Sequence, residues 1–167
     1  MTSSEMSLGP SARKIVARIR KVREAASKAT QSKRRFADYR YLRSVLRAYR
    51  YFEDQQLMTH LVETAPSVLM TPVRAGCHPL RVIIDATCIQ PDLRLRSRWT
   101  RSLQFALSEN VDPEELMRFL SANNGVAGCA DLASKTARKR PRFGTKQKPP
   151  SDLMRKSILN RRLTIGQ

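Results

Sequence analysis

The stretch DPEELMRFLSANNGVAGCADLASKTARKRPR, residues 112–142, contains the most clearly bounded pair of helices in the sequence. Asp112 and Pro113 predict a helix start. The carboxylate can accept hydrogen bonds from the free N–H groups of a first turn, and proline loses nothing at the first helical position. Gly125 follows two asparagines and predicts the helix end, since glycine readily takes the left-handed conformation that closes a helix. A second helix is expected over residues 127–139.

Two short helices joined by a glycine turn occur in DNA-binding helix–turn–helix units, and also in helical hairpins that only build a core. In the DNA-binding unit, a small residue lies four positions before the turn glycine and an aliphatic residue lies six positions after it. Ser121 fits the first position, whereas Asp131 does not fit the second. Residues 112–139 are therefore a helix-turn-helix-like pair, and the sequence leaves open whether it contacts DNA or only builds a core.

The net charge is the strongest compositional feature of the chain. Its 167 residues include 32 Lys and Arg against 14 Asp and Glu, a formal net charge of +18, with a pI near 11.0. Residues 1–51 hold 14 basic and 3 acidic residues (net +11), residues 52–134 hold 7 and 10 (net −3), and residues 135–167 hold 11 and 1 (net +10). Self-repulsion on this scale favours a polyanionic partner, and nucleic acid offers dense phosphate charge.

This charge pattern predicts a near-neutral folded centre between two basic ends. We expect a mostly α-helical protein with one core domain over residues 36–137, built from about six or seven helices. Residues 1–35 are expected to be a basic N-terminal extension, and residues 138–167 a basic, partly disordered C-terminal arm with a short terminal helix. The N-terminal extension contains an amphipathic helix whose apolar stripe should pack on the domain: Ile15, Val16, Ile19, Val22 and Ala26.

Aromatic residues and arginines alternate in the stretch 36–60, where helical spacing predicts one long helix continuing to residue 65. The arginines are either the solvated face of this helix or part of a surface for RNA and single strands, whose bases stack on rings while guanidinium groups hold phosphates. The predicted core-facing rings are Phe36, Tyr39 and Tyr49. Tyr41 and Tyr51 lie off that face and are the candidate base-stacking residues.

The segment LRVIIDATC, residues 80–88, fits two structures equally well by its apolar spacing. Its β-branched run could be a buried strand that ends at Asp85, or one face of a helix. Because helices are predicted on both sides, we interpret it as helix, and the strand stays the alternative. Ser97 is expected to cap the next helix, in which Trp99 should anchor the core.

The sequence predicts a non-enzymatic nucleic-acid-binding protein that uses phosphate contacts, with DNA favoured over RNA. One alternative is an RNA-binding or ribosome-associated protein that uses the Arg/Tyr-rich helix, and another is an adaptor that binds protein or an acidic membrane through apolar terminal helices. A homodimer is conceivable, since two-fold dimers are usual for DNA readers. The cations expected to contact nucleic acid are Lys33, Arg34, Arg35, Arg40, Arg43, Arg47, Arg50, Lys135, Arg138, Lys139, Arg140, Arg142, Lys146 and Lys148.

Several other classes lack their sequence signals. Three cysteines without CxxC spacing argue against a disulfide framework and for a reducing compartment. The adjacent pair Cys77-His78 has no second pair to complete a zinc site, and no Gly-rich phosphate loop accompanies Asp85, so we expect no metal, cofactor or catalytic residue. Neither a signal peptide nor a membrane-spanning run is evident, so we expect no membrane association. The expected location is cytoplasmic, nucleoid-associated in a bacterium or nuclear in a eukaryote.

Overall fold

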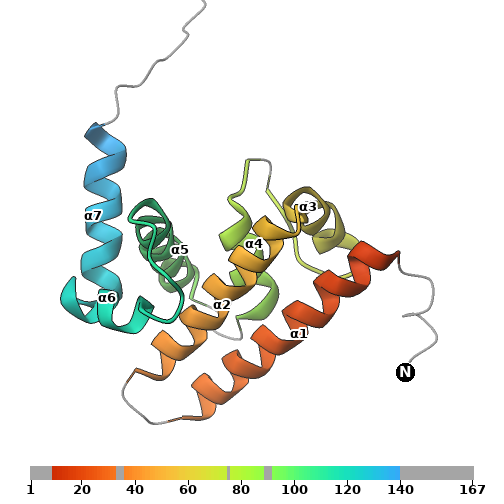
Figure 1. Cartoon of the computed structure of the whole chain (residues 1–167), viewed down its shortest axis with the longest axis horizontal. Helices are drawn as coiled ribbons and strands as arrows, with labels where there is room; N and C mark the ends of the chain where they lie inside the picture. Colours follow the sequence, from red (N-terminus) through yellow and green to blue (C-terminus); the bar gives the residue numbers. More distant parts are fainter. Residues whose placement is uncertain (1–8, 33–35, 75, 89–91, 140–167) are drawn as a thin grey trace, which may run out of the picture.

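The computed structural model of the chain describes residues 9–32, 36–74, 76–88 and 92–139, and of residues 137–139 only the backbone. Across these ranges the structure has helices and no strand, which confirms the predicted mostly α fold. Figure 1 shows α1 and α2 side by side along one flank and α6 and α7 at the other. The helices of the described ranges are α1 (Pro10–Gln31), α2 (Ala37–Asp54), α3 (Met58–Ser67), α4 (Pro79–Thr87), α5 (Leu93–Ser108), α6 (Leu116–Ala122) and α7 (Gly125–Lys139).

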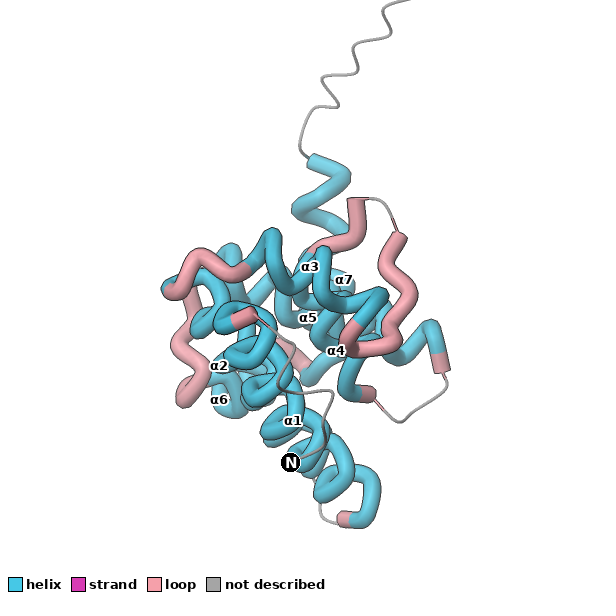
Figure 2. The backbone as a smooth tube through the Cα atoms, turned by 90° about the vertical axis from the view of Figure 1, so that its right-hand side faces the viewer, coloured by secondary structure: helices cyan, strands magenta, loops and turns pink. Residues whose placement is uncertain are grey.

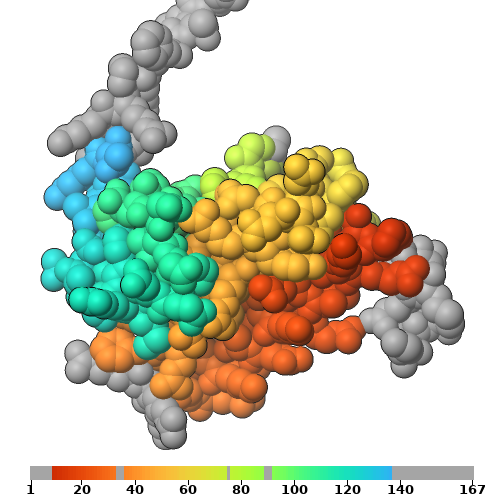
Figure 3. Space-filling model, in the orientation of Figure 1, coloured from red at the N-terminus to blue at the C-terminus, as the bar shows by residue number. Residues whose placement is uncertain are grey.

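Helix α1 packs lengthwise on α2, and the two run antiparallel (Figure 1). The predicted apolar stripe is confirmed, because Ile15, Ile19, Val22 and Ala26 are buried and Val16 packs at their edge. Most of the stability of a helix in a protein comes from packing of its apolar face, so burial of this stripe stabilises α1. The N-terminal helix therefore shares one core with α2 and α4, and Figure 3 shows α1 and α2 in contact along their length.

Helix α4 is surrounded by α1, α2, α3 and α5. A helix that buries more than one face needs apolar residues all round, and this explains why its sequence also fitted a buried strand. The interpretation of residues 80–88 as helix is confirmed. The buried residues of α4 are Leu80, Val82, Ile83, Ile84, Ala86 and Thr87.

The prediction of one long helix over residues 36–65 is wrong. The chain turns at Gln56, and two helices, α2 and α3, lie on either side of this turn. Gln56 has a φ of 54°. The N–H of Leu57 donates to the carbonyl oxygen of Phe52 (2.8 Å), and that of Gln56 donates to the carbonyl oxygen of Glu53 (3.0 Å). This is the Schellman closure, with glutamine where glycine is usual. Phe52 and Leu57 are both buried beside the turn, so their packing offsets the strain at Gln56.

Helix α5 begins five residues earlier than predicted. Its N-cap is Asp92 rather than Ser97, since Asp92 Oδ1 accepts a hydrogen bond from the backbone N of Arg94 at 2.7 Å. Trp99 is 3% exposed and anchors the core as expected, with its ring centroid 5.3 Å from that of Tyr41. The earlier start places Arg94 and Arg96 on the helix, and both positions matter below.

The turn between α6 and α7 depends on two glycines. Asp112 caps a turn at 113–115, by accepting a hydrogen bond from the N–H of Glu114, but α6 itself starts only at Leu116. Gly125 has a φ of 74°, as predicted for the turn, and it opens α7. A Cβ on Gly128 would overlap the backbone oxygen of Asn123, so the tight approach of α7 to the end of α6 requires glycine there.

Helix α7 lies along α5, and burial of Cys129 and Ala130 holds the two together. Figure 2 shows the C-terminal turns of α7 standing clear of the other helices. The described chain therefore ends on a helix that projects from the body.

Candidate functional site

The arginines of α2 are held by carboxylates from other parts of the chain. Arg47 Nε donates to Glu114 Oε1 at 2.7 Å, and its terminal nitrogen pairs with the same oxygen. Arg43 reaches the other oxygen of Glu114 at 3.6 Å. One exposed carboxylate before α6 therefore neutralises much of the charge of two arginines that were predicted to contact nucleic acid.

Arg50 and Arg18, which lie near Arg47, also have partners within the protein. Arg50 pairs with Glu53 (3.0 Å) and donates to Asn110 Oδ1 (3.1 Å). The Arg18 guanidinium lies 4.8 Å from the Tyr51 ring centroid, in cation–π geometry, and also donates to a backbone oxygen of α2. These groups border a hollow of about 550 Å³, which Asp54 and Asp112 also line, so its charges are largely balanced.

Tyr41 cannot stack on a base, which corrects the sequence interpretation. Its side chain is 2% exposed, it packs against Trp99, and its hydroxyl is 2.9 Å from Thr87 Oγ1. Burial raises the pKa of this phenol above its usual value. The true inner face of α2 includes Tyr41 with Leu42, Val45 and Phe52, whereas Tyr49 is only partly buried. Tyr51 stays partly exposed, but Arg18 covers its ring.

A different set of arginines forms an exposed row on α5. Arg94, Arg98 and Arg101 are spaced four and three residues apart, so they lie on one side of the helix over about 10 Å. Arg101 donates to Ser134 Oγ on α7 at 3.1 Å, which places the row beside α7, where Lys135 is exposed. Within the described chain, the side chains of Arg94 and Arg98 have no ion-pair or hydrogen-bond partner. We call Arg94, Arg98 and Arg101 the α5 row.

The sequence places Arg98 and Arg101 on a helix where they could touch a backbone phosphate, but it does not join Arg94 to them. Because Ser97 was taken as the cap, Arg94 fell in the connection before the helix, and the row of three is visible only when Arg94 is helical. The signal that would have found it is Asp92, which follows Pro91 as an ordinary helix cap.

The exposed side of α7 is poorly suited to reading base edges. Its exposed residues up to 136 are Ala127, Asp131, Lys135 and Thr136, and Asp131 would face phosphates with the wrong charge. Base edges are read mainly by Arg, Lys, Asn and Gln. The pair of α6 and α7 is a helical hairpin packed on α2 and α5, and Lys135 is the described cation at its projecting end.

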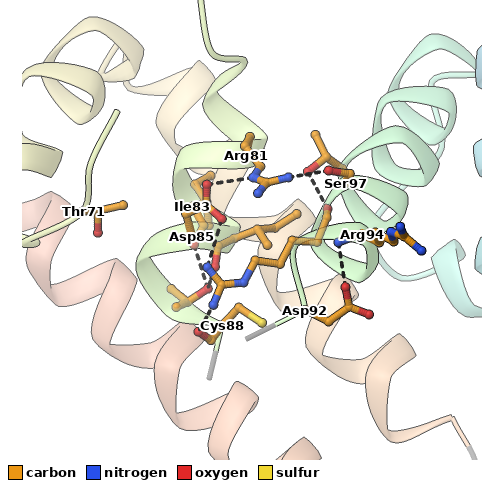
Figure 4. A network of polar contacts seen from close by, with 12 residues as sticks. Thr71, Arg81, Ile83, Asp85, Cys88, Asp92, Arg94 and Ser97 are labelled. Atoms are coloured by element: carbon orange, nitrogen blue, oxygen red, sulfur yellow. Dashed lines mark hydrogen bonds and ion pairs between the residues drawn. The ribbon is translucent and has the colours of Figure 1, made fainter. Parts of the chain in front are cut away.

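Asp85 joins α4 to α5 rather than forming a reactive centre (Figure 4). Arg81 Nε donates to one of its oxygens at 2.7 Å, and Arg96 pairs with the other at 3.3 Å. Arg81 also donates to Ser97 Oγ at 2.8 Å, so Ser97 serves this network instead of capping a helix. Both carboxylate oxygens are therefore engaged by arginines.

Burial shifts the pKa of Cys77, His78 and Cys129. In the ranges that the structure covers, no three His, Cys, Asp or Glu side chains meet as metal ligands. Burial raises the pKa of Cys129 to about 11 and raises that of Cys77, so both thiols are protonated at neutral pH and are poor nucleophiles. His78 Nδ1 accepts from the backbone N of Leu80 and caps α4, while its ring stacks on Tyr49. Burial lowers the pKa of His78.

The other predicted binding residues divide by position. Arg40 is exposed on α2, and no described residue pairs with its guanidinium. Arg138 and Lys139 lie on the last turn of α7, where only the backbone is described. Outside the described residues are Lys33, Arg34, Arg35, Arg140, Arg142, Lys146 and Lys148.

Comparisons of the chain with protein-family models, with curated proteins and with solved structures found no match. The helices that the structure describes include none with the length and apolarity to cross a bilayer.

Proposed function

We propose that the protein binds nucleic acid without catalysing a reaction, through phosphate contacts, and that duplex DNA is its preferred partner. The observation that carries the proposal is the exposed α5 row, which lies beside the end of α7 where the basic sequence 135–167 begins. A cytoplasmic or nucleoid-associated location in a bacterium, or a nuclear one in a eukaryote, goes with this proposal.

The α5 row has the geometry that a phosphate backbone requires. Duplex DNA carries about one charge per 1.7 Å of its axis, so a row of about 10 Å faces several phosphates. Arg94 and Arg98 have no acidic partner among the described residues, in contrast to the arginines of α2, and phosphate can therefore bind them without displacing a carboxylate.

The residues available on α7 favour binding without strong sequence preference. Phosphate contacts fix position on the duplex and carry no direct sequence information. Because Ala127 and Asp131 occupy the exposed side of α7, base reading by this helix is not part of the proposal. The basic sequence after residue 139 would add phosphate contacts that follow the backbone.

The two alternatives are less well supported. Burial of Tyr41 and cover of Tyr51 by Arg18 remove the exposed rings on which the RNA interpretation depended. An adaptor that binds through the apolar stripe of α1 would have to pull that stripe out of the core.

Fluorescence anisotropy with random duplex DNA, single-stranded DNA and structured RNA, each over a salt series, tests the proposal. Arg94→Ala/Arg98→Ala should weaken duplex binding and reduce the slope of log K against log salt by about two, one for each lost phosphate contact. Arg47→Ala/Arg50→Ala removes the same charge from neutralised arginines and should change the slope little.

Equal losses of duplex DNA affinity in the two double variants would show that only net charge matters. The α5 row would then not be the binding surface. Tighter binding of RNA or single strands would replace duplex DNA as the preferred partner. Absence of binding to all three at low salt would refute the proposal.

A further inference from the structure

A second hollow, of about 320 Å³, lies between α1 and α2 near their connected ends. Its lining differs from that of the first hollow, which Asp54 and Asp112 border. None of the described residues that border the second hollow is acidic. Three small residues, Ala25, Ala29 and Ala37, also line it and leave room between the helices. Its polar lining residues are Lys28, Ser32, Arg40, Arg43 and Ser44. We call it the α1–α2 hollow.

The cations of the α1–α2 hollow are available to a ligand. Lys28 and Arg40 are exposed and have no ion-pair partner among the described residues. Of the two arginines that pair with Glu114, Arg43 is held more loosely than Arg47. Its contact with Glu114 is 3.6 Å, longer than a hydrogen bond, and its buried Nε has no hydrogen-bond partner. A buried donor without an acceptor is unusual in a folded protein.

The cations of the hollow have the chemistry that binds an oxyanion. Guanidinium groups bind phosphate oxygens in pairs, and a lysine adds a compact charge. The single hydroxyl proton of Ser44 is already donated to the Arg40 carbonyl oxygen at 3.1 Å, so the ligand would be held by the cations and not by this hydroxyl. The volume of about 320 Å³ exceeds that of a phosphate group alone, so the hollow has room for a phosphate together with part of the molecule that carries it.

We propose that the α1–α2 hollow binds a phosphate group held by Lys28, Arg40 and Arg43. In the nucleic-acid-binding function proposed above, on which this second step rests, the group is a backbone phosphodiester. The same chemistry would also hold the phosphate of a small molecule, so the test needs one probe for each source.

The test compares the intact chain with two double variants of equal charge. Lys28→Ala/Arg40→Ala removes two cations of the hollow, and Lys14→Ala/Lys21→Ala removes two exposed lysines from the outer face of the same helix α1. Circular dichroism and Trp99 emission establish that each variant is folded. Duplex DNA affinity is measured by anisotropy, and inorganic pyrophosphate is added alone while the melting temperature is recorded.

We expect the hollow variant to bind duplex DNA roughly tenfold more weakly than the lysine control, since charge-assisted hydrogen bonds are lost together with charge. Pyrophosphate should raise the melting temperature of the wild type and of the control, but not of the hollow variant. For Arg40→Lys, the affinity for duplex DNA should lie between that of the hollow variant and that of the wild type, because lysine cannot bind two oxygens in a fixed fork.

The outcomes separate this site from the proposed function. Dependence of the pyrophosphate effect on Lys28 and Arg40, with no nucleic-acid binding by the wild type, would keep the phosphate site and overturn the proposed function. If nucleic acid binds and the hollow variant loses no more affinity than the control, with no difference in the pyrophosphate effect, the phosphate site is refuted and the proposed function stands.

Discussion

Asp85 and Glu114 each hold two arginines, yet the two clusters have different surroundings. Asp85 binds Arg81 and Arg96 between α4 and α5, and its side chain is 20% exposed. Glu114 binds Arg43 and Arg47 between α2 and the segment before α6, and its side chain is 58% exposed. The first carboxylate is enclosed by helices and the second is open to solvent.

The difference in exposure decides what each cluster contributes. Removing one partner of a poorly solvated pair leaves charges that neither water nor protein satisfies, so the loss of stability is large. An exposed pair gains little over its hydrated partners. The Asp85 cluster therefore stabilises the fold, whereas the Glu114 cluster mainly reduces the charge that α2 presents to a ligand.

Asp85→Asn should give the largest effect. The substitution keeps the shape but leaves Arg81 and Arg96 without a counter-charge, and we expect a loss of about 2–3 kcal/mol in the free energy of unfolding. Urea denaturation followed by circular dichroism measures it. Asp131→Asn, at an exposed carboxylate without an ion pair in the described structure, is the control and should change stability by less than about 0.5 kcal/mol. Equal losses in both variants would show that Asp85 has no special role.

Glu114→Gln should cost less than about 1 kcal/mol of stability but strengthen duplex DNA binding, because it releases Arg43 and Arg47. The matched control is Glu63→Gln, which removes the same charge from an exposed carboxylate whose ion-pair partner among the described residues is His60. Anisotropy titrations of both variants at one salt concentration give the comparison. An equal gain of affinity in the two would mean that net charge alone is responsible and that Glu114 does not restrain the arginines.

Salt should act on the two clusters unequally. At about 1 M salt the screening length is near 3 Å, so the stability difference between the wild type and Glu114→Gln should nearly vanish. The difference for Asp85→Asn should largely persist, since its surroundings exclude ions. Repeating the urea denaturations in 1 M NaCl checks this expectation, and parallel behaviour of the two variants would remove the distinction between them.

The smallest effect on stability should come from His78. Its Nδ1 can accept the hydrogen bond from the backbone N of Leu80 only while the ring is neutral. Burial lowers the pKa of His78 in the folded state, so protonation favours unfolding and also removes the acceptor of the α4 cap. Stability is then complete above the ordinary histidine pKa and falls as the pH drops through that value towards the lower folded one. His78→Asn retains a capping side chain and should flatten the decrease in melting temperature between pH 7.5 and 5. His60→Asn, at the exposed histidine, should leave the decrease unchanged.

Much of the fold follows from local sequence patterns. The apolar spacing of α1, the helix at 80–88 and the glycine at 125 could all be predicted, because each depends on neighbouring residues. The chain turn at Gln56 could not, since it depends on the packing of Leu57 in the finished core. The need for glycine at 128 is equally hidden, because it arises from the close approach of the Asn123 backbone.

The candidate site was harder to predict for a related reason. The sequence shows how many arginines the chain has, but their pairing depends on residues far apart. Arg47 and Glu114 are 67 positions apart, and no local pattern joins them. Arg94 was missed as a member of the α5 row through an error of five positions in the helix cap, since Ser97 was chosen in place of Asp92. Tyr41 was expected off the core-facing side because Phe36, Tyr39 and Tyr49 were assigned to that side, and its burial follows from the contacts of α2 with α4 and α5.

Trp99 gives the protein a built-in optical reporter. It is the chain's only tryptophan, it is 3% exposed, and its ring lies next to Tyr41 in the middle of the core. Its emission should be blue-shifted while the helices are packed and should move to the red when water reaches the indole. Because neighbouring Arg98 belongs to the exposed α5 row, a ligand on that row would approach the same helix from outside without touching the indole. Emission wavelength would then register folding, while an external label registers binding, and the two events could be followed in one cuvette.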